Sequence, residues 1–171
     1  MKKNLIEGLL DAEEVWQTDE KRVEEIAVEY YETLFTSSNP TDFTELVQAI
    51  QPKVSAAMEH MLVGDFTADE CRRALKQMYP LKAPGLDGMP QLFLSHFWPT
   101  CGEVVTKTVL DFLNLHIVHP NFNGTHVVLI PKIQEPKKII DFRPISLCNI
   151  VYKIASKAIA NRLRKDLSFH Y

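Results

Sequence analysis

Val127-Val128-Leu129-Ile130-Pro131-Lys132 is the run on which the fold prediction rests, together with Asp141-Phe142-Arg143-Pro144-Ile145-Ser146-Leu147, which follows after a polar gap. Residues 127–130 are apolar and mostly β-branched, and Gly124 and Pro131 bound them, which predicts a strand. Residues 132–138 are polar and predict a turn. The returning strand is expected from Ile139 to about Phe142, so the sequence predicts one β-hairpin here.

Apolar residues recur at helical spacing in the rest of the chain. We expect one helix over residues 18–35, capped by Thr18, and a second over about 42–62, which Pro52 should kink or split. The other expected starts are two capping boxes, Thr67-Ala68-Asp69-Glu70 and Thr100-Cys101-Gly102-Glu103, and the cap Asn149 of a final helix that ends near Leu167, with Ile159 on its core face. Helices, then a hairpin, then a helix predict a mostly helical α+β fold rather than alternating βαβ units.

Length and composition fit an ordinary folded domain. The chain has 171 residues, of which 46% are hydrophobic, enough for a core. No apolar run approaches the roughly 20 residues of a membrane helix, so no membrane contact is expected. Cys71, Cys101 and Cys148 are widely spaced and form no CxxC, which favours a reduced, intracellular compartment.

Charge is distributed unevenly along the chain. Residues 1–70 contain five Lys and Arg against sixteen Asp and Glu, whereas residues 125–171 contain nine against three. A basic segment on an otherwise acidic protein is typical of contact with a polyanion such as nucleic acid. A lysine-rich, solvated helix surface would produce the same pattern.

A second run, Lys82-Ala83-Pro84-Gly85-Leu86-Asp87-Gly88, predicts a loop. Its two glycines would let backbone amides approach an anion closely, with Lys82 alongside. The pattern Pro-Gly-x-Asp-Gly is by itself a common turn.

In this order and spacing, the loop run and the hairpin runs resemble the fingers segment of reverse transcriptases from plant LINE-type (non-LTR) retrotransposons. The resemblance continues through Ser146-Leu147-Cys148-Asn149 and Ala160-Asn161-Arg162-Leu163 and covers roughly residues 60–171. It departs at Leu86, where the family usually has proline. Residues 1–62 look like the acidic helical linker that precedes the polymerase, and 63–171 like a partial reverse transcriptase domain, truncated before the palm.

The resemblance implies the partial fingers subdomain of a right-hand polymerase and an RNA-directed DNA polymerase (nucleotidyltransferase) lineage. Its partners would be deoxynucleoside triphosphates and an RNA or DNA template-primer, in the nucleus or cytoplasm, and Mg²⁺ is implied for the full-length family. By resemblance Lys132 and Arg143 contact nucleotide or template, and Asp141 orients Arg143 as its ion-pair partner. An exposed turn lysine and a purely structural Asp141–Arg143 pair are the alternatives. The resemblance assigns Lys82, Gly85, Asp87 and Gly88 to a contact with the template backbone.

Catalytic carboxylates are missing from the sequence. It contains no Asp-Asp pair, and adjacent acids such as Glu13-Glu14 point about 100° apart on a helix. We therefore predict no catalytic residue, no metal ligand and no bound cofactor in this chain, and no polymerase activity without the missing palm and thumb. The alternatives are a non-catalytic nucleic-acid-binding module, a helical protein-interaction fragment, or a translated relic.

Overall fold

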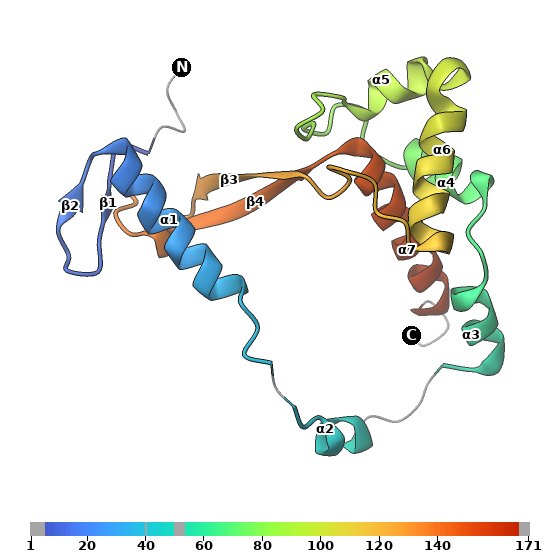
Figure 1. Cartoon of the computed structure of the whole chain (residues 1–171), viewed down its shortest axis with the longest axis horizontal. Helices are drawn as coiled ribbons and strands as arrows, with labels where there is room; N and C mark the ends of the chain where they lie inside the picture. Colours follow the sequence, from blue (N-terminus) through green and yellow to red (C-terminus); the bar gives the residue numbers. More distant parts are fainter. Residues whose placement is uncertain (1–5, 40, 50–53, 168–171) are drawn as a thin grey trace. The chain divides into compact units, whose positions relative to one another are not determined.

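The structure is a computed structural model that describes residues 6–39, 41–49 and 54–167. It forms two compact units. The first unit combines Met1–Pro52 with Val127–Ile145, and the second combines Lys53–His126 with Ser146–Tyr171. Helices and two small two-stranded sheets occur in the described residues, which confirms the predicted mostly helical α+β class (Figure 1).

The first unit begins with a hairpin that the sequence analysis did not predict. Strands β1 (Leu9–Leu10) and β2 (Trp16–Gln17) pair in antiparallel fashion. They were missed because two-residue strands are too short to show an alternation of polar and apolar residues. The Asp11 side chain organises the turn, since its Oδ1 accepts the N–H groups of Glu13 and Val15 at 3.0 and 2.9 Å.

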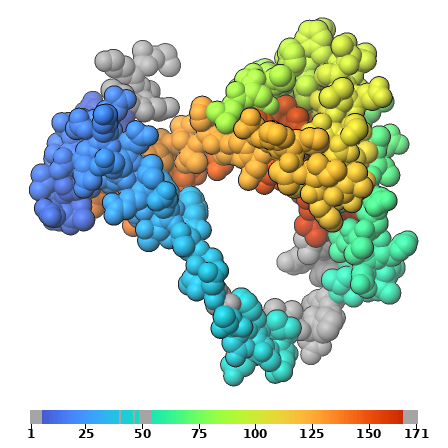
Figure 2. All heavy atoms as spheres, in the orientation of Figure 1, coloured from blue at the N-terminus to red at the C-terminus, as the bar shows by residue number. Residues whose placement is uncertain are grey.

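Helix α1 (Glu20–Phe35) follows, and Figure 2 shows β1, β2 and α1, in blue, as one packed body. Asp19 caps α1, because its Oδ2 accepts the N–H of Arg22 at 3.1 Å; the prediction of Thr18 as the cap is wrong. The helix packs over a small core of three buried residues, Leu9, Ile139 and Phe142. The short helix α2 (Thr44–Ala49) comes next in the chain.

The predicted hairpin is present, with β3 (Thr125–Pro131) paired to β4 (Phe142–Cys148). The returning strand was placed too early. Ile139–Asp141 is a turn of 3₁₀ helix, η1, because the Asp141 carboxylate accepts the N–H groups of Lys137 and Lys138 at 3.0 and 2.9 Å. The chain becomes extended only from Phe142 onward.

The second unit is a cluster of helices. Its members are α3 (Ala56–Val63), α4 (Ala68–Lys76), α5 (Gln91–His96), α6 (Trp98–Leu115) and α7 (Ile150–Leu167). Helix α4 packs against both α6 and α7, with Cys71, Ala74 and Leu75 buried as predicted. Ile159 of α7 is 39% exposed, so its predicted place in the core is wrong. No helix in the described ranges is both long and apolar enough to cross a bilayer.

Helix starts were predicted with mixed success. The expected helix over residues 42–62 is split, as α2 and α3 show, although Pro52 itself lies outside the described residues. The capping box at Thr67 and Glu70 is confirmed, with Glu70 N–H to Thr67 Oγ1 at 3.3 Å. The capping box predicted from Thr100 to Glu103 is wrong. Helix α6 begins earlier than predicted, at Trp98, because Pro99 fits the first turn of a helix.

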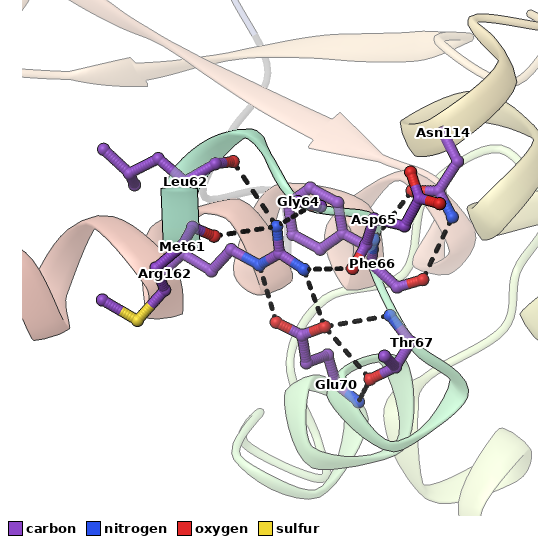
Figure 3. Close-up of polar contacts among 9 residues, drawn as sticks. All are labelled: Met61, Leu62, Gly64, Asp65, Phe66, Thr67, Glu70, Asn114 and Arg162. Carbon is purple, nitrogen blue, oxygen red and sulfur yellow. Dashed lines mark hydrogen bonds and ion pairs between the residues drawn. The ribbon is translucent and has the colours of Figure 1, made fainter. Parts of the chain in front are cut away.

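A buried arginine joins three of these helices (Figure 3). Arg162 of α7 is only 7% exposed, and its guanidinium stacks on the Phe66 ring at 3.6 Å. It donates to the Glu70 carboxylate at 2.7 and 2.9 Å. It also donates to carbonyl oxygens at the end of α3 and just beyond, those of Met61, Leu62, Gly64 and Asp65. The last carbonyls of a helix lack intrahelical donors, so Arg162 serves as the C-terminal cap of α3.

Candidate nucleic-acid interface

Lys132 lies directly after β3, where the chain enters the turn of the hairpin. Its backbone N–H donates to the carbonyl of Asp141 at 2.8 Å, and its Nζ donates to the carbonyl of Ile140 at 2.7 Å. The side chain remains exposed. An ammonium group has three donors, so two remain available to a phosphate while the third fixes the group at the hairpin end.

Arg143 lies in β4 and is exposed to solvent. Within the described part of the chain, its guanidinium makes no ion pair and no side-chain hydrogen bond. A free guanidinium offers a planar fork of donors that matches two phosphate oxygens. Arg143 is therefore available to bind a polyanion.

Asp141 does not orient Arg143 as the sequence analysis expected. Both residues are described, yet no ion pair forms between them. The Asp141 carboxylate instead holds the N–H groups of Lys138 and Lys137, and these hydrogen bonds lower its pKa. Its role in the structure is to close the turn that carries Lys132.

The predicted loop is present, and both of its glycines have conformational reasons. Gly85 closes a turn by accepting the N–H of Gly88 at 3.2 Å. A Cβ at Gly85 would lie 2.4 and 2.5 Å from backbone atoms of Cys148 and Asn149, closer than any real contact. Gly88 has φ +65°, a left-handed conformation that glycine adopts readily. The glycines thus let the loop lie directly on the chain just before α7.

Asn149 holds the N-cap position of α7 that the sequence analysis gave it, because its carbonyl accepts the N–H of Lys153 at 3.1 Å. The side-chain cap comes instead from Asp87. Its Oδ2 accepts the N–H of Ile150 at 3.0 Å, and its Oδ1 accepts that of Met89 at 3.0 Å. The Asn149 side chain is turned toward the loop, where its Oδ1 accepts the Asp87 N–H at 3.1 Å. Loop and helix start therefore form one hydrogen-bonded assembly.

Two lysines lie at the loop and the first turn of α7. Lys82 is exposed at the start of the loop, and Lys153 in the first turn of α7 donates from Nζ to the carbonyl of Ala83 at 2.7 Å. Burial lowers the pKa of Lys153, and the charge of Lys82 lowers it further. The sequence analysis did not name Lys153 as a candidate, because a lysine in a basic helix is equally consistent with a solvated surface. The hydrogen bonds between Asp87 and residues 149–150, which hold the loop against the start of α7, have no sequence signature of their own.

The side chains that could bind a metal ion do not form a cluster in the described residues. Among the residues described here, no three His, Cys, Asp or Glu side chains come close enough to hold one ion. We therefore assign no ligand for the Mg²⁺ that the resemblance implies to the residues that the structure describes.

No protein-family model matches this chain. The chain is similar to a frog protein described as the transposon TX1 uncharacterized 149 kDa protein, from Xenopus laevis. The two are 30% identical over 152 residues, which cover 88% of this chain and 12% of that protein. The chain thus spans about an eighth of its relative's length and is related to a transposon-encoded protein.

Proposed function

We propose that this chain is part of the reverse transcriptase of a non-LTR retrotransposon, and that its β3–β4 hairpin contacts nucleic-acid phosphates through Lys132 and Arg143. The observation that carries the proposal is the exposed guanidinium of Arg143, which has no ion pair with any described residue and lies on the same hairpin as the tethered ammonium of Lys132. The relation to a transposon protein and the order of the motifs support the assignment to this lineage. In this proposal, residues 1–62 precede the polymerase domain and 63–171 belong to its fingers.

The proposed role is electrostatic rather than covalent. Transfer of a nucleotidyl group needs positive charge on the triphosphate and template, and separately needs carboxylates that hold metal ions. Lys132 can supply a point charge and Arg143 a bidentate fork. We assign no catalytic residue to this chain, so its own contribution is binding and orientation.

The loop has the second place in the proposal. Lys82 and Lys153 would meet the template backbone, while Gly85, Asp87 and Gly88 give the loop its shape. Lys132 and Arg143 belong to the first compact unit and the loop to the second, so each site is testable by its own variants.

The salt dependence of binding tests the hairpin. Affinity for an RNA–DNA hybrid is measured by fluorescence anisotropy between about 50 and about 200 mM KCl, since each phosphate contact contributes roughly 0.7 to 0.9 to the log–log slope. The variant Lys132→Ala with Arg143→Ala should flatten the slope by about 1.5. The matched control is Lys21→Ala with Arg22→Ala, which also removes one exposed lysine and one exposed arginine from the first unit.

The expected result is a flattened slope for the hairpin variant and an unchanged slope for the control. Equal slopes for wild type, hairpin variant and control would remove the hairpin from the binding site.

A further inference from the structure

Helix α4 carries an exposed basic stripe that neither the hairpin nor the loop includes. Cys71, Ala74 and Leu75 face the core. Arg72, Arg73 and Lys76 lie on the opposite side of the helix and are exposed, together with Asp69 near its start. We call Arg72, Arg73 and Lys76 the α4 stripe.

The positive charge of the stripe is not neutralised by ion pairs within the part of the unit that the structure describes. Its three cations make no ion pair with any residue in the described ranges. Glu70, the acid next to the stripe, is paired with Arg162 of α7 at 2.7 Å instead. Asp69 lies beside the three cations, so these four side chains together carry a net positive charge in an acidic protein.

A groove adjoins the stripe between α4 and α6. Its volume is about 530 Å³, within the usual range for a ligand of nucleotide size. Trp98 and Leu110 give it an apolar wall, and Arg72 lies at its edge with Asp69. Its other charged groups are Glu103 and the pair Lys107–Asp111, which is closed at 2.5 Å.

We infer that the α4 stripe and this groove bind single-stranded nucleic acid, with phosphates on Arg72, Arg73 and Lys76 and a base against Trp98. Single-strand sites combine cations that follow the backbone with aromatic side chains that contact bases. An acidic peptide would satisfy the cations but would leave the apolar wall of the groove without a planar ligand. The inference rests on the proposed function, because it adds a second contact to the same nucleic-acid substrate.

Three variants of the full chain test the inference. The first is Arg72→Ala with Arg73→Ala and Lys76→Ala, and the second retains charge through Arg72→Lys, Arg73→Lys and Lys76→Arg. The third is the hairpin variant described above. Far-UV circular dichroism checks that each variant folds, which is expected because the stripe is exposed.

Binding of a single-stranded RNA oligonucleotide is measured across the same salt range, with a polyglutamate peptide of equal charge as competitor. The alanine variant should lose about two units of log–log slope, since each phosphate contact on a single strand contributes roughly 0.7. The charge-retaining variant should keep the wild-type slope, and polyglutamate should compete at least tenfold less well than the same RNA unlabelled. A wild-type slope in the alanine variant, or equal competition by polyglutamate, would overturn the inference.

The two sites fail in distinguishable ways. A flattened slope in the hairpin variant with none in the α4 variant contradicts this inference and leaves the proposed function in place. The reverse result supports the stripe as a single-strand site, while the hairpin site is decided by the salt dependence of binding to the RNA–DNA hybrid.

Discussion

Arg162 and Glu70 form a two-pronged ion pair, with Nε to Oε1 at 2.7 Å and Nη2 to Oε2 at 2.9 Å. The residues are separated by 92 positions in sequence, and the pair fixes α7 to the start of α4. The same guanidinium satisfies carbonyls at the end of α3, so a single side chain determines how three helices meet.

Replacing Arg162 should destabilise the second unit strongly. Arg162→Ala leaves the Glu70 carboxylate and several carbonyls without donors, and removing one partner of a buried ion pair typically costs about 3 to 5 kcal/mol. Arg162→Lys should recover little of this, because an ammonium group cannot donate to the carboxylate and the carbonyls together. Urea unfolding followed by Trp98 fluorescence measures the loss, in a Trp16→Phe background that leaves Trp98 as the one tryptophan.

Arg164→Ala is the control for this prediction. Arg164 lies on the same helix and is exposed, so its loss should change the free energy of unfolding by less than about 0.5 kcal/mol. Equal effects of the two alanine substitutions would show that the contacts of Arg162 with Glu70 and the end of α3 do not stabilise the unit.

Stability should depend on pH through Glu70. The Arg162 hydrogen bonds lower the pKa of Glu70 from 4.5 to about 2. A carboxyl group whose pKa is lower in the folded than in the unfolded protein stabilises the fold at pH values above its unfolded-state pKa. This stabilisation, on the order of 3 kcal/mol, is lost as the pH falls from about 4.5 to about 2. Urea midpoints measured over this interval should fall more steeply for wild type than for Glu70→Gln. The same pH dependence of the urea midpoint in wild type and Glu70→Gln would show that the Glu70 carboxylate does not stabilise the fold in this way.

The two loop glycines should respond differently to alanine. At Gly85 a Cβ would meet backbone atoms at 2.4 to 2.5 Å, so Gly85→Ala must displace the loop from α7. At Gly88 no atom lies within 4 Å, and only the positive φ opposes alanine, at a cost of about 1 to 2 kcal/mol. The midpoint temperature of thermal unfolding should therefore be clearly lower for Gly85→Ala than for Gly88→Ala. The opposite ranking would show that the close approach is not essential.

The three cysteines should differ in reactivity. Burial raises the pKa of Cys71 to about 11, with the charge of Glu70 adding to the effect. The thiolate fraction is then about a hundredfold below that of an ordinary cysteine, and the sulfur is also inaccessible. Mass spectrometry after brief iodoacetamide treatment of the folded protein should find Cys101 and Cys148 modified before Cys71. Early modification of Cys71 would mean that α4 is not packed as described.

Local patterns in the sequence predicted much of the fold. The capping box at Thr67, the buried face of α4 and the strand that contains Val127–Ile130 are all decided by near neighbours, and all three are confirmed. The hairpin return was misplaced because the Asp141 side chain competes for the backbone N–H groups of the turn. Side-chain hydrogen bonds of this kind depend on geometry that periodicity does not record.

The candidate site was predicted less completely. Lys132 and Arg143 are exposed, as a phosphate contact requires, whereas Asp87 proved to be the cap of a helix 63 positions away. Arg162 entered the sequence analysis only within the run Ala160–Leu163 that carries the family resemblance. Its burial depends on contacts with residues about 100 positions earlier, which no local pattern encodes.

Cross-linking tests the central claim most directly. The full chain is bound to an RNA–DNA hybrid that carries photoreactive groups on its backbone, irradiated, digested and analysed by mass spectrometry. We predict cross-linked peptides from residues 125–148, and we predict that they disappear in the variant with Lys132→Ala and Arg143→Ala. Salt-sensitive binding without any cross-link in residues 125–148 would contradict the claim that this hairpin grips the nucleic acid.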